Sequence, residues 1–205
     1  MRRLAARHAC LLAIASLPTS LAFAQGSTPA LVPLATPAQQ IAVAVLALPA
    51  EMRDSATVLG YREAGRLVEL RHGSNGMICL ADDPAVPRFQ VACYHESLEP
   101  FMARGRALRA SGVTGDQVDS VRFREIREGT LVMPRTPAAL YSLNGEPGSW
   151  DPVTNTVQNG RPLYVVYIAY ATPESTGIPD KPARGQPWIM HPGTPKAHIM
   201  YTPGM

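Results

Sequence analysis

The sequence predicts an α+β fold: a small, mainly antiparallel sheet of short strands, one amphipathic helix, many loops and one disulfide bond. Three observations support this fold class. The chain of 205 residues contains 20 prolines and 16 glycines, which interrupt helices and favour turns. Short runs of β-branched and aromatic residues, of which 163–171 is the strongest, are typical of strands. One longer segment, 97–110, has its apolar residues on a single helical face.

The first 24 residues have the three parts of a secretory signal peptide. Arg2 and Arg3 give a basic start, residues 9–17 form a short apolar run, and 22–24 is an A-x-A cleavage sequence. We expect cleavage after Ala24 and a mature protein that is periplasmic or secreted. The apolar run is too short to span a bilayer, and we expect no membrane span after signal cleavage.

Removal of residues 1–24 changes the charge balance. The whole chain has 19 Lys and Arg and 16 Asp and Glu, and the leader holds three arginines and no acid. The mature chain then has 16 basic and 16 acidic residues, so no net charge draws it to nucleic acid or to anionic lipid. We expect residues 25–35 to be a flexible tail and 36–205 to be a single globular domain.

The cysteines predict a structural disulfide. Cys10 leaves with the signal peptide, so the mature chain keeps Cys79 and Cys93, an even pair in a compartment that oxidises thiols. The alternatives are a redox-active pair or a metal–thiolate site, but the C-x-x-C spacing that redox enzymes use is absent. Closing a loop of this size stabilises a fold by about 3 kcal/mol in the chain-entropy model.

The first half of the mature chain is expected to hold one helix and a hairpin. Thr36 and Pro37 are a typical helix start, and an Ala/Val/Leu run continues to residue 48. Asn75 and Gly76 lie in a turn cluster and favour positive φ, so the strand that follows is expected to return antiparallel to the one before it. Strands are expected at 56–59, 65–71 and 77–80.

The second half begins with the amphipathic helix at 97–110. Its polar face is expected to meet water and consists of Glu99, Arg104, Arg106 and Arg109. Residues 113–133 fit either a helix or a strand. A long polar loop, 144–162, contains Trp150 and is expected to be functional or mobile. Strands are expected at 138–143, 163–171, 188–191 and 198–201.

Two stretches carry a resemblance to a known family. Residues 73–79 read Gly-Ser-Asn-Gly-Met-Ile-Cys, and Cys93 follows before a helix; residues 185–190 and 193–200 read Gly-Gln-Pro-Trp-Ile-Met and Gly-Thr-Pro-Lys-Ala-His-Ile-Met. The chain resembles a family of small exported bacterial proteins with a G-[ST]-N-G-W-x-C turn-strand, a G-G-P-[WY]-V-M segment and a C-terminal G-T-P-x-A-H-[LI]-M motif. Met77 replaces the family's Trp, and Gln186 replaces a Gly. The resemblance implies an exported single domain and no particular chemistry.

The C-terminal histidines are candidate metal ligands. If His191 pairs with His198 across a hairpin, strand alternation places Ile189, His191, His198 and Met200 on one face. Two imidazoles and a thioether suit copper, or zinc with one more ligand.

The further ligand could come from His72, or from His95 beside Glu96. The alternative interpretation is structural: His198 hydrogen-bonds a loop carbonyl, while Met190 and Met200 pack in the core.

No motif in the sequence identifies a reaction, and no catalytic residue is assigned. The chain lacks the G-x-S-x-G elbow of hydrolases, the lysine of a phosphate-binding loop and the spacing of an EF-hand. Candidate binding residues are Trp188, Asn75 and Trp150. The leading hypothesis is an exported, non-enzymatic module that binds a small ligand or a partner protein and needs no cofactor. The alternative is a metal-binding protein or metalloenzyme that uses His191 and His198.

Overall fold

The computed structural model describes residues 34–63, 65–183 and 185–203. The predicted signal peptide and most of the predicted tail lie outside them. In this part of the chain the helices are α1 (Pro37–Ala44), α2 (Glu99–Ala110), α3 (Asp116–Arg127) and α4 (Pro173–Thr176). The strands are β1 (Thr57–Glu63), β2 (Arg66–Arg71), β3 (Met77–Leu80), β4 (Phe89–His95), β5 (Ala138–Gly145), β6 (Trp150–Asp151), β7 (Thr156–Val157), β8 (Arg161–Tyr167), β9 (Trp188–Met190) and β10 (His198–Tyr201).

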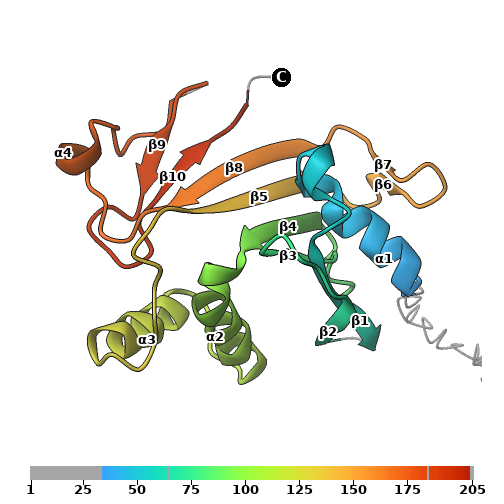
Figure 1. Ribbon diagram of the computed structural model, residues 1–205, viewed down its shortest axis with the longest axis horizontal. Helices are drawn as coiled ribbons and strands as arrows, with labels where there is room; N and C mark the ends of the chain where they lie inside the picture. Colours follow the sequence, from blue (N-terminus) through green and yellow to red (C-terminus); the bar gives the residue numbers. More distant parts are fainter. Residues whose placement is uncertain (1–33, 64, 184, 204–205) are drawn as a thin grey trace, which may run out of the picture. The chain divides into compact units, whose positions relative to one another are not determined.

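Eight of these strands form one mixed sheet in the order β2-β1-β3-β4-β5-β8-β10-β9 (Figure 1). Only β1 and β3 pair in parallel, and the other neighbours are antiparallel. Strands β6 and β7 form a separate hairpin inside the predicted polar loop. The α+β class, the disulfide and the mainly antiparallel pairing are confirmed. The expected small sheet is wrong, because short strands from both halves of the chain join side by side.

The hairpin expected between residues 65–71 and 77–80 does not form. Strand β2 pairs antiparallel with β1, and β3 lies on the other side of β1, parallel to it. The connection crosses the start of β1: the backbone N–H groups of Ser74 and Asn75 both donate to the Ser55 carbonyl, at 2.7 and 3.2 Å. A Cβ on Gly73 would lie 2.2 Å from the backbone nitrogen of Thr57, so this crossing requires a glycine.

The two faces of the sheet are buried by different helices. Along β4, Phe89, Val91 and Cys93 belong to the core beneath α1, whereas Tyr94 belongs to the core beneath α2. Because successive strand residues point to opposite faces, α1 covers one face, and α2 with α3 covers the other (Figure 1).

A second amphipathic helix, α3, resolves the ambiguous segment 113–133 and corrects the expectation of only one. It packs beside α2, where Arg104 donates to both carboxylate oxygens of Glu125, with Nη2–Oε1 at 2.6 Å. Pro100 is accommodated in the first turn of α2. No helix in the described ranges is both long and apolar enough to cross a membrane.

Helix α1 also completes the hydrogen bonding of β1. Strand β3 pairs with β1 only as far as Leu59, so the backbone groups of Tyr61 on that side have no strand partner. The buried amide of Gln40 takes the place of a strand: its Oε1 accepts from the Tyr61 N–H at 2.7 Å, and its Nε2 donates to the Tyr61 carbonyl at 2.8 Å. Gln40 therefore fixes the position of α1 on the sheet.

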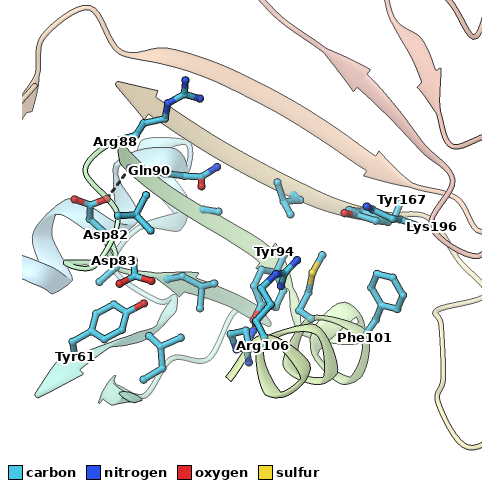
Figure 2. Close-up of a pocket in the computed structure, with 18 of the residues that line it drawn as sticks. Tyr61, Asp82, Asp83, Arg88, Gln90, Tyr94, Phe101, Arg106, Tyr167 and Lys196 are labelled. Carbon is cyan, nitrogen blue, oxygen red and sulfur yellow. Dashed lines mark hydrogen bonds between the residues drawn. The ribbon is translucent and has the colours of Figure 1, made fainter. Parts of the chain in front are cut away.

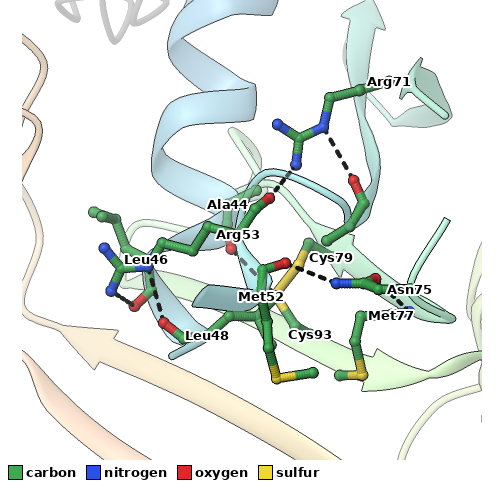
Figure 3. The surroundings of a disulfide bond; sticks show 11 residues. Ala44, Leu46, Leu48, Met52, Arg53, Arg71, Asn75, Met77, Cys79 and Cys93 are labelled. Atoms are coloured by element: carbon green, nitrogen blue, oxygen red, sulfur yellow. Dashed lines mark hydrogen bonds between the residues drawn. A yellow bond between two sulfur atoms is a disulfide. The ribbon is translucent and has the colours of Figure 1, made fainter. Parts of the chain in front are cut away.

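The disulfide Cys79–Cys93 joins residues directly opposite each other on β3 and β4 (Figure 3). Both cysteines are fully buried, and Cys93 Sγ lies 3.4 Å from the Ala44 carbonyl oxygen at the end of α1. Since a one-residue slip between strands would turn every side chain to the wrong face, this bond fixes the register of the central strands.

Replacing both cysteines with alanine should lower the free energy of unfolding by about 3 kcal/mol, because the unfolded chain loses its cross-link. Urea denaturation followed by circular dichroism measures the change. Dithiothreitol should destabilise the wild type by a similar amount and leave the Cys79→Ala/Cys93→Ala variant unaffected. Equal stability of the wild type in oxidising and reducing buffer would contradict this prediction.

Candidate functional site

A groove of about 640 Å³ lies on the sheet face that α2 covers only in part (Figure 2). Its floor is apolar and comes from four strands of the sheet: Leu67 of β2, Leu80 of β3, Ala92 of β4 and Leu140 of β5. The small side chain of Ala92 leaves space at the centre. One wall is α2, and the opposite wall is the segment 81–88 that connects β3 to β4.

An acidic end of the groove is formed by Asp82 and Asp83. Asp82 accepts a hydrogen bond from the backbone N–H of Gln90 at 2.8 Å. Burial, with a smaller contribution from the neighbouring Asp83 charge, raises the pKa of Asp82 to about 6. The hydroxyl of Tyr61 faces the same end, where burial and the Asp83 carboxylate raise the pKa of the Tyr61 phenol to about 12.

The middle of the groove holds a charged cluster of three side chains. Arg106 of α2 donates to the Tyr94 hydroxyl at 2.8 Å and to Glu99 Oε1 at 2.6 Å, and the Tyr94 hydroxyl donates to Glu99 Oε2. Burial and the bond to Glu99 raise the pKa of Tyr94, so its hydroxyl stays protonated at neutral pH. The cluster holds the Arg106 guanidinium in one orientation along the groove.

The far end of the groove contains a buried cation. Arg122 of α3 is only 4% exposed and lies 3.7 Å over the ring of Phe101, to whose carbonyl its Nη1 donates at 3.1 Å. Its Nη2 donates to Asp119, which also accepts from Lys196 Nζ at 2.8 Å. A Cβ on Gly105 would lie 2.9 Å from Arg122 Nη1, so the glycine in α2 makes room for this side chain.

One nitrogen of this buried cation is left without a partner. Within the described residues, Arg122 Nε has no hydrogen-bond acceptor, although an unpaired buried donor costs about 1–3 kcal/mol. Burial acts to raise the pKa of Asp119, but the hydrogen bonds from Lys196 and Arg122 hold it below its usual value. Asp119 therefore stays ionised and neutralises only one of its two cationic neighbours.

The lining of the groove is basic overall. Asp82 and Asp83 line it together with five cations, Arg88, Arg106, Arg109, Arg122 and Lys196. Glu99 pairs with Arg106, and Asp119 is shared by Arg122 and Lys196. Arg88 and Arg109 are exposed and form no ion pair with the described residues. A basic rim over an apolar floor can bind a molecule that has an apolar body and an anionic group.

The binding residues predicted from sequence lie elsewhere. Asn75 is structural in its contacts: its side chain donates to the Met52 carbonyl at 2.8 Å and accepts from the Met77 N–H at 3.0 Å. Trp150 packs against the α1 core and donates to Asn155. Trp188 lies on β9, away from the groove lining.

Sequence reasoning missed the groove residues. Arg106, expected to face water, is half-buried against Tyr94. The adjacent carboxylates of Asp82 and Asp83, placed directly after a strand, were the one available signal, but they also fit a turn.

The C-terminal hairpin forms with a register one residue away from the expected one. His198 lies opposite Met190, and Met200 lies opposite Trp188, so the expected pairing of His191 with His198 is wrong. The reason is that His191 leaves the strand with φ of +56°. The two imidazole rings are nevertheless close, with centroids 5.7 Å apart.

The predicted further ligand, His95, lies at the end of β4 and is exposed. Its Nδ1 is 2.9 Å from Ser97 Oγ at the start of a short 3₁₀ turn. His72 is exposed beside Glu69. Among the residues that the structure describes, no cluster of three or more His, Cys, Asp or Glu side chains could hold a metal ion.

No family model, curated protein or solved structure matches the chain. The resemblance to small exported bacterial proteins therefore stays a prediction.

Asp82→Asn should change the pH dependence of stability. With a pKa near 6 when folded and near 3.8 when unfolded, Asp82 stabilises the fold fully below about pH 4, and this contribution is lost as the pH rises through 6. The variant should therefore gain stability relative to the wild type between pH 4 and 7, by at most about 3 kcal/mol.

Urea denaturation at a series of pH values measures the difference. Asp180→Asn, at an exposed position outside the groove, is the matched control. Parallel profiles for the wild type and Asp82→Asn would show that Asp82 titrates alike in the folded and unfolded chains, contrary to this prediction.

Proposed function

We propose that this protein is an exported, non-enzymatic module that binds an amphipathic anion in the groove between the sheet and α2. The ligand has an apolar body and one carboxylate, sulfonate or phosphate group. The observation that carries the proposal is the combination of an apolar floor with two exposed rim arginines, Arg88 and Arg109, that form no ion pair with the described residues. Export is supported by the signal-like leader and by the buried disulfide.

Each part of the groove has a role in this binding. The apolar body lies over Leu80, Ala92 and Leu140, where burial contributes about 25 cal/mol per Å² of apolar surface. The anionic group lies near Arg106 and Arg109 on α2. Arg106 is already oriented by Tyr94 and Glu99, so little side-chain entropy is lost when it binds.

The lining favours binding over covalent catalysis. Its residues include no serine, threonine, cysteine or histidine, which are common nucleophiles and bases in group transfer. Its remaining candidates for acid–base chemistry, Asp82 with Asp83 and Lys196, lie at opposite ends of the groove (Figure 2). Its tyrosines Tyr61 and Tyr167 have pKa values raised to about 12 by burial and, for Tyr61, by Asp83. These hydroxyls are therefore hydrogen-bond donors at neutral pH.

Asp82 makes the binding sensitive to pH. Above about pH 6 it adds a negative charge beside Asp83, which repels an anion despite the nearby Arg88. An anionic ligand should therefore bind more tightly at pH 5 than at pH 7.5.

The probe for this proposal is 8-anilinonaphthalene-1-sulfonate, which has an aromatic body and one sulfonate. We expect saturable binding of one dye per folded chain, measured by fluorescence titration. Ala92→Trp should abolish binding by filling the groove. Arg109→Glu should weaken it about tenfold, the effect of roughly 1.4 kcal/mol.

Two matched variants control for non-specific effects: Ala107→Trp on the exposed side of α2 and Arg127→Glu on α3, neither of which lines the groove. Both should bind the dye like the wild type. Asp82→Asn should bind more tightly at pH 7.5 and show a weaker pH dependence. Binding that responds equally to the groove variants and to the controls would refute the proposal.

A further inference from the structure

Two histidines at the end of the sheet lie at a distance suited to one metal ion. His198 of β10 is buried, and His191 follows β9 directly. Their ring centroids are 5.7 Å apart. Two imidazoles that bind one metal through nitrogen–metal bonds of about 2.0 Å place their ring centroids roughly 5–6.5 Å apart. The observed spacing falls in this range.

The ring of His198 is held in the way that metal-bound imidazoles usually are. Its Nδ1 lies 2.7 Å from the Lys196 carbonyl oxygen. A carbonyl only accepts, so the proton is on Nδ1 and the lone pair is on Nε2. A backbone carbonyl that fixes the other ring nitrogen is the common outer partner of a metal-ligating histidine. The Tyr167 ring, 4.9 Å away, packs against the imidazole and limits its rotation.

His191 reaches its position through an unusual backbone conformation. Its φ of +56° is in the left-handed region, which few residues other than glycine adopt. The Thr194 hydroxyl donates to the His191 carbonyl at 2.8 Å and stabilises this turn. The turn ends β9 one residue earlier than expected and leaves the His191 ring beside His198.

Two methionines project from the same face of the β9–β10 hairpin as His198. Met190 lies directly opposite His198 in the β9–β10 pair, and directly opposed residues project from the same face with Cβ atoms about 4.5–5.5 Å apart. Met200, two residues from His198 on the same strand, faces the same way. Imidazole and thioether are the ligands that soft copper(I) prefers.

The neighbouring charges are compatible with a monovalent ion. Lys196 is the nearest cation in the sequence, and its ammonium is paired with Asp119. That pair occupies Asp119, one of the two carboxylates near the His191 imidazole, and the other, Asp116, is exposed on α3. The donors of the hairpin itself, two imidazoles and a thioether, are neutral, which favours copper(I) over zinc or calcium.

We propose that His191, His198 and Met190 form a copper(I)-binding site at the β9–β10 end of the sheet. The site is independent of the proposed anion binding, although Tyr167 both contacts His198 and lines the groove. Failure of the dye to bind would leave this proposal standing, and failure of copper to bind would leave the groove proposal standing.

The test is an anaerobic titration of the purified protein with copper(I) against the chelator bicinchoninate, with native mass spectrometry for stoichiometry. The wild type should bind one copper(I). His191→Asn should lose at least about 100-fold in affinity; asparagine tolerates positive φ, so this variant removes the ring and keeps the turn. Met190→Leu, a substitution of similar volume, should lose about tenfold.

Matched controls are His95→Asn and Met52→Leu, which lie outside this hairpin. Both should bind copper(I) like the wild type, and thermal unfolding should show that every variant is folded. Zinc should bind more weakly than copper(I). The proposal is overturned by sub-stoichiometric copper in the wild type, by unchanged affinity in His191→Asn or Met190→Leu, or by tighter binding of zinc.

Discussion

The structure depends on how an eight-stranded sheet with two apolar faces is covered by few helices. In the described part of the chain, α1 buries one face of the central strands, and α2 with α3 buries the other. The disulfide holds β3 and β4 in the register that sends Cys79 and Cys93 toward α1 and Leu80 and Ala92 toward α2. The groove is the part of this second face that α2 does not reach.

Local sequence patterns identified most elements but could not place them. Local patterns predict the start of α1 at Thr36 and Pro37, the amphipathic helix α2 and the strand β8, because each depends on residues close together in the sequence. These patterns do not predict the order of the strands in the sheet. Asn75 is typical of a hairpin turn, but its side chain donates to the Met52 carbonyl at the point where the chain crosses the start of β1. That contact spans 23 residues and leaves no local signal.

The candidate site was harder to predict for the same reason. Ala92, Arg106 and Arg122 come from a strand and two helices, and only the packing of α2 on the sheet brings them together. Arg122 lies in the segment whose sequence fits either a helix or a strand, and its burial depends on Gly105, which has no side chain. The C-terminal histidines were found from their spacing, but the register was one residue off, since the backbone of His191 ends β9.

The two edges of the sheet are protected in different ways. Strand β2 carries Arg66, Glu69 and Arg71, charges that another strand would have to desolvate. Strand β9 has three residues, is bounded by Pro187 and Pro192, and its Ile189 N–H already donates to the Pro179 carbonyl at 2.9 Å. The charges on β2 disfavour pairing with another strand, and the short, partly paired β9 offers few free backbone groups. Both features disfavour extension of the sheet into intermolecular β-assemblies.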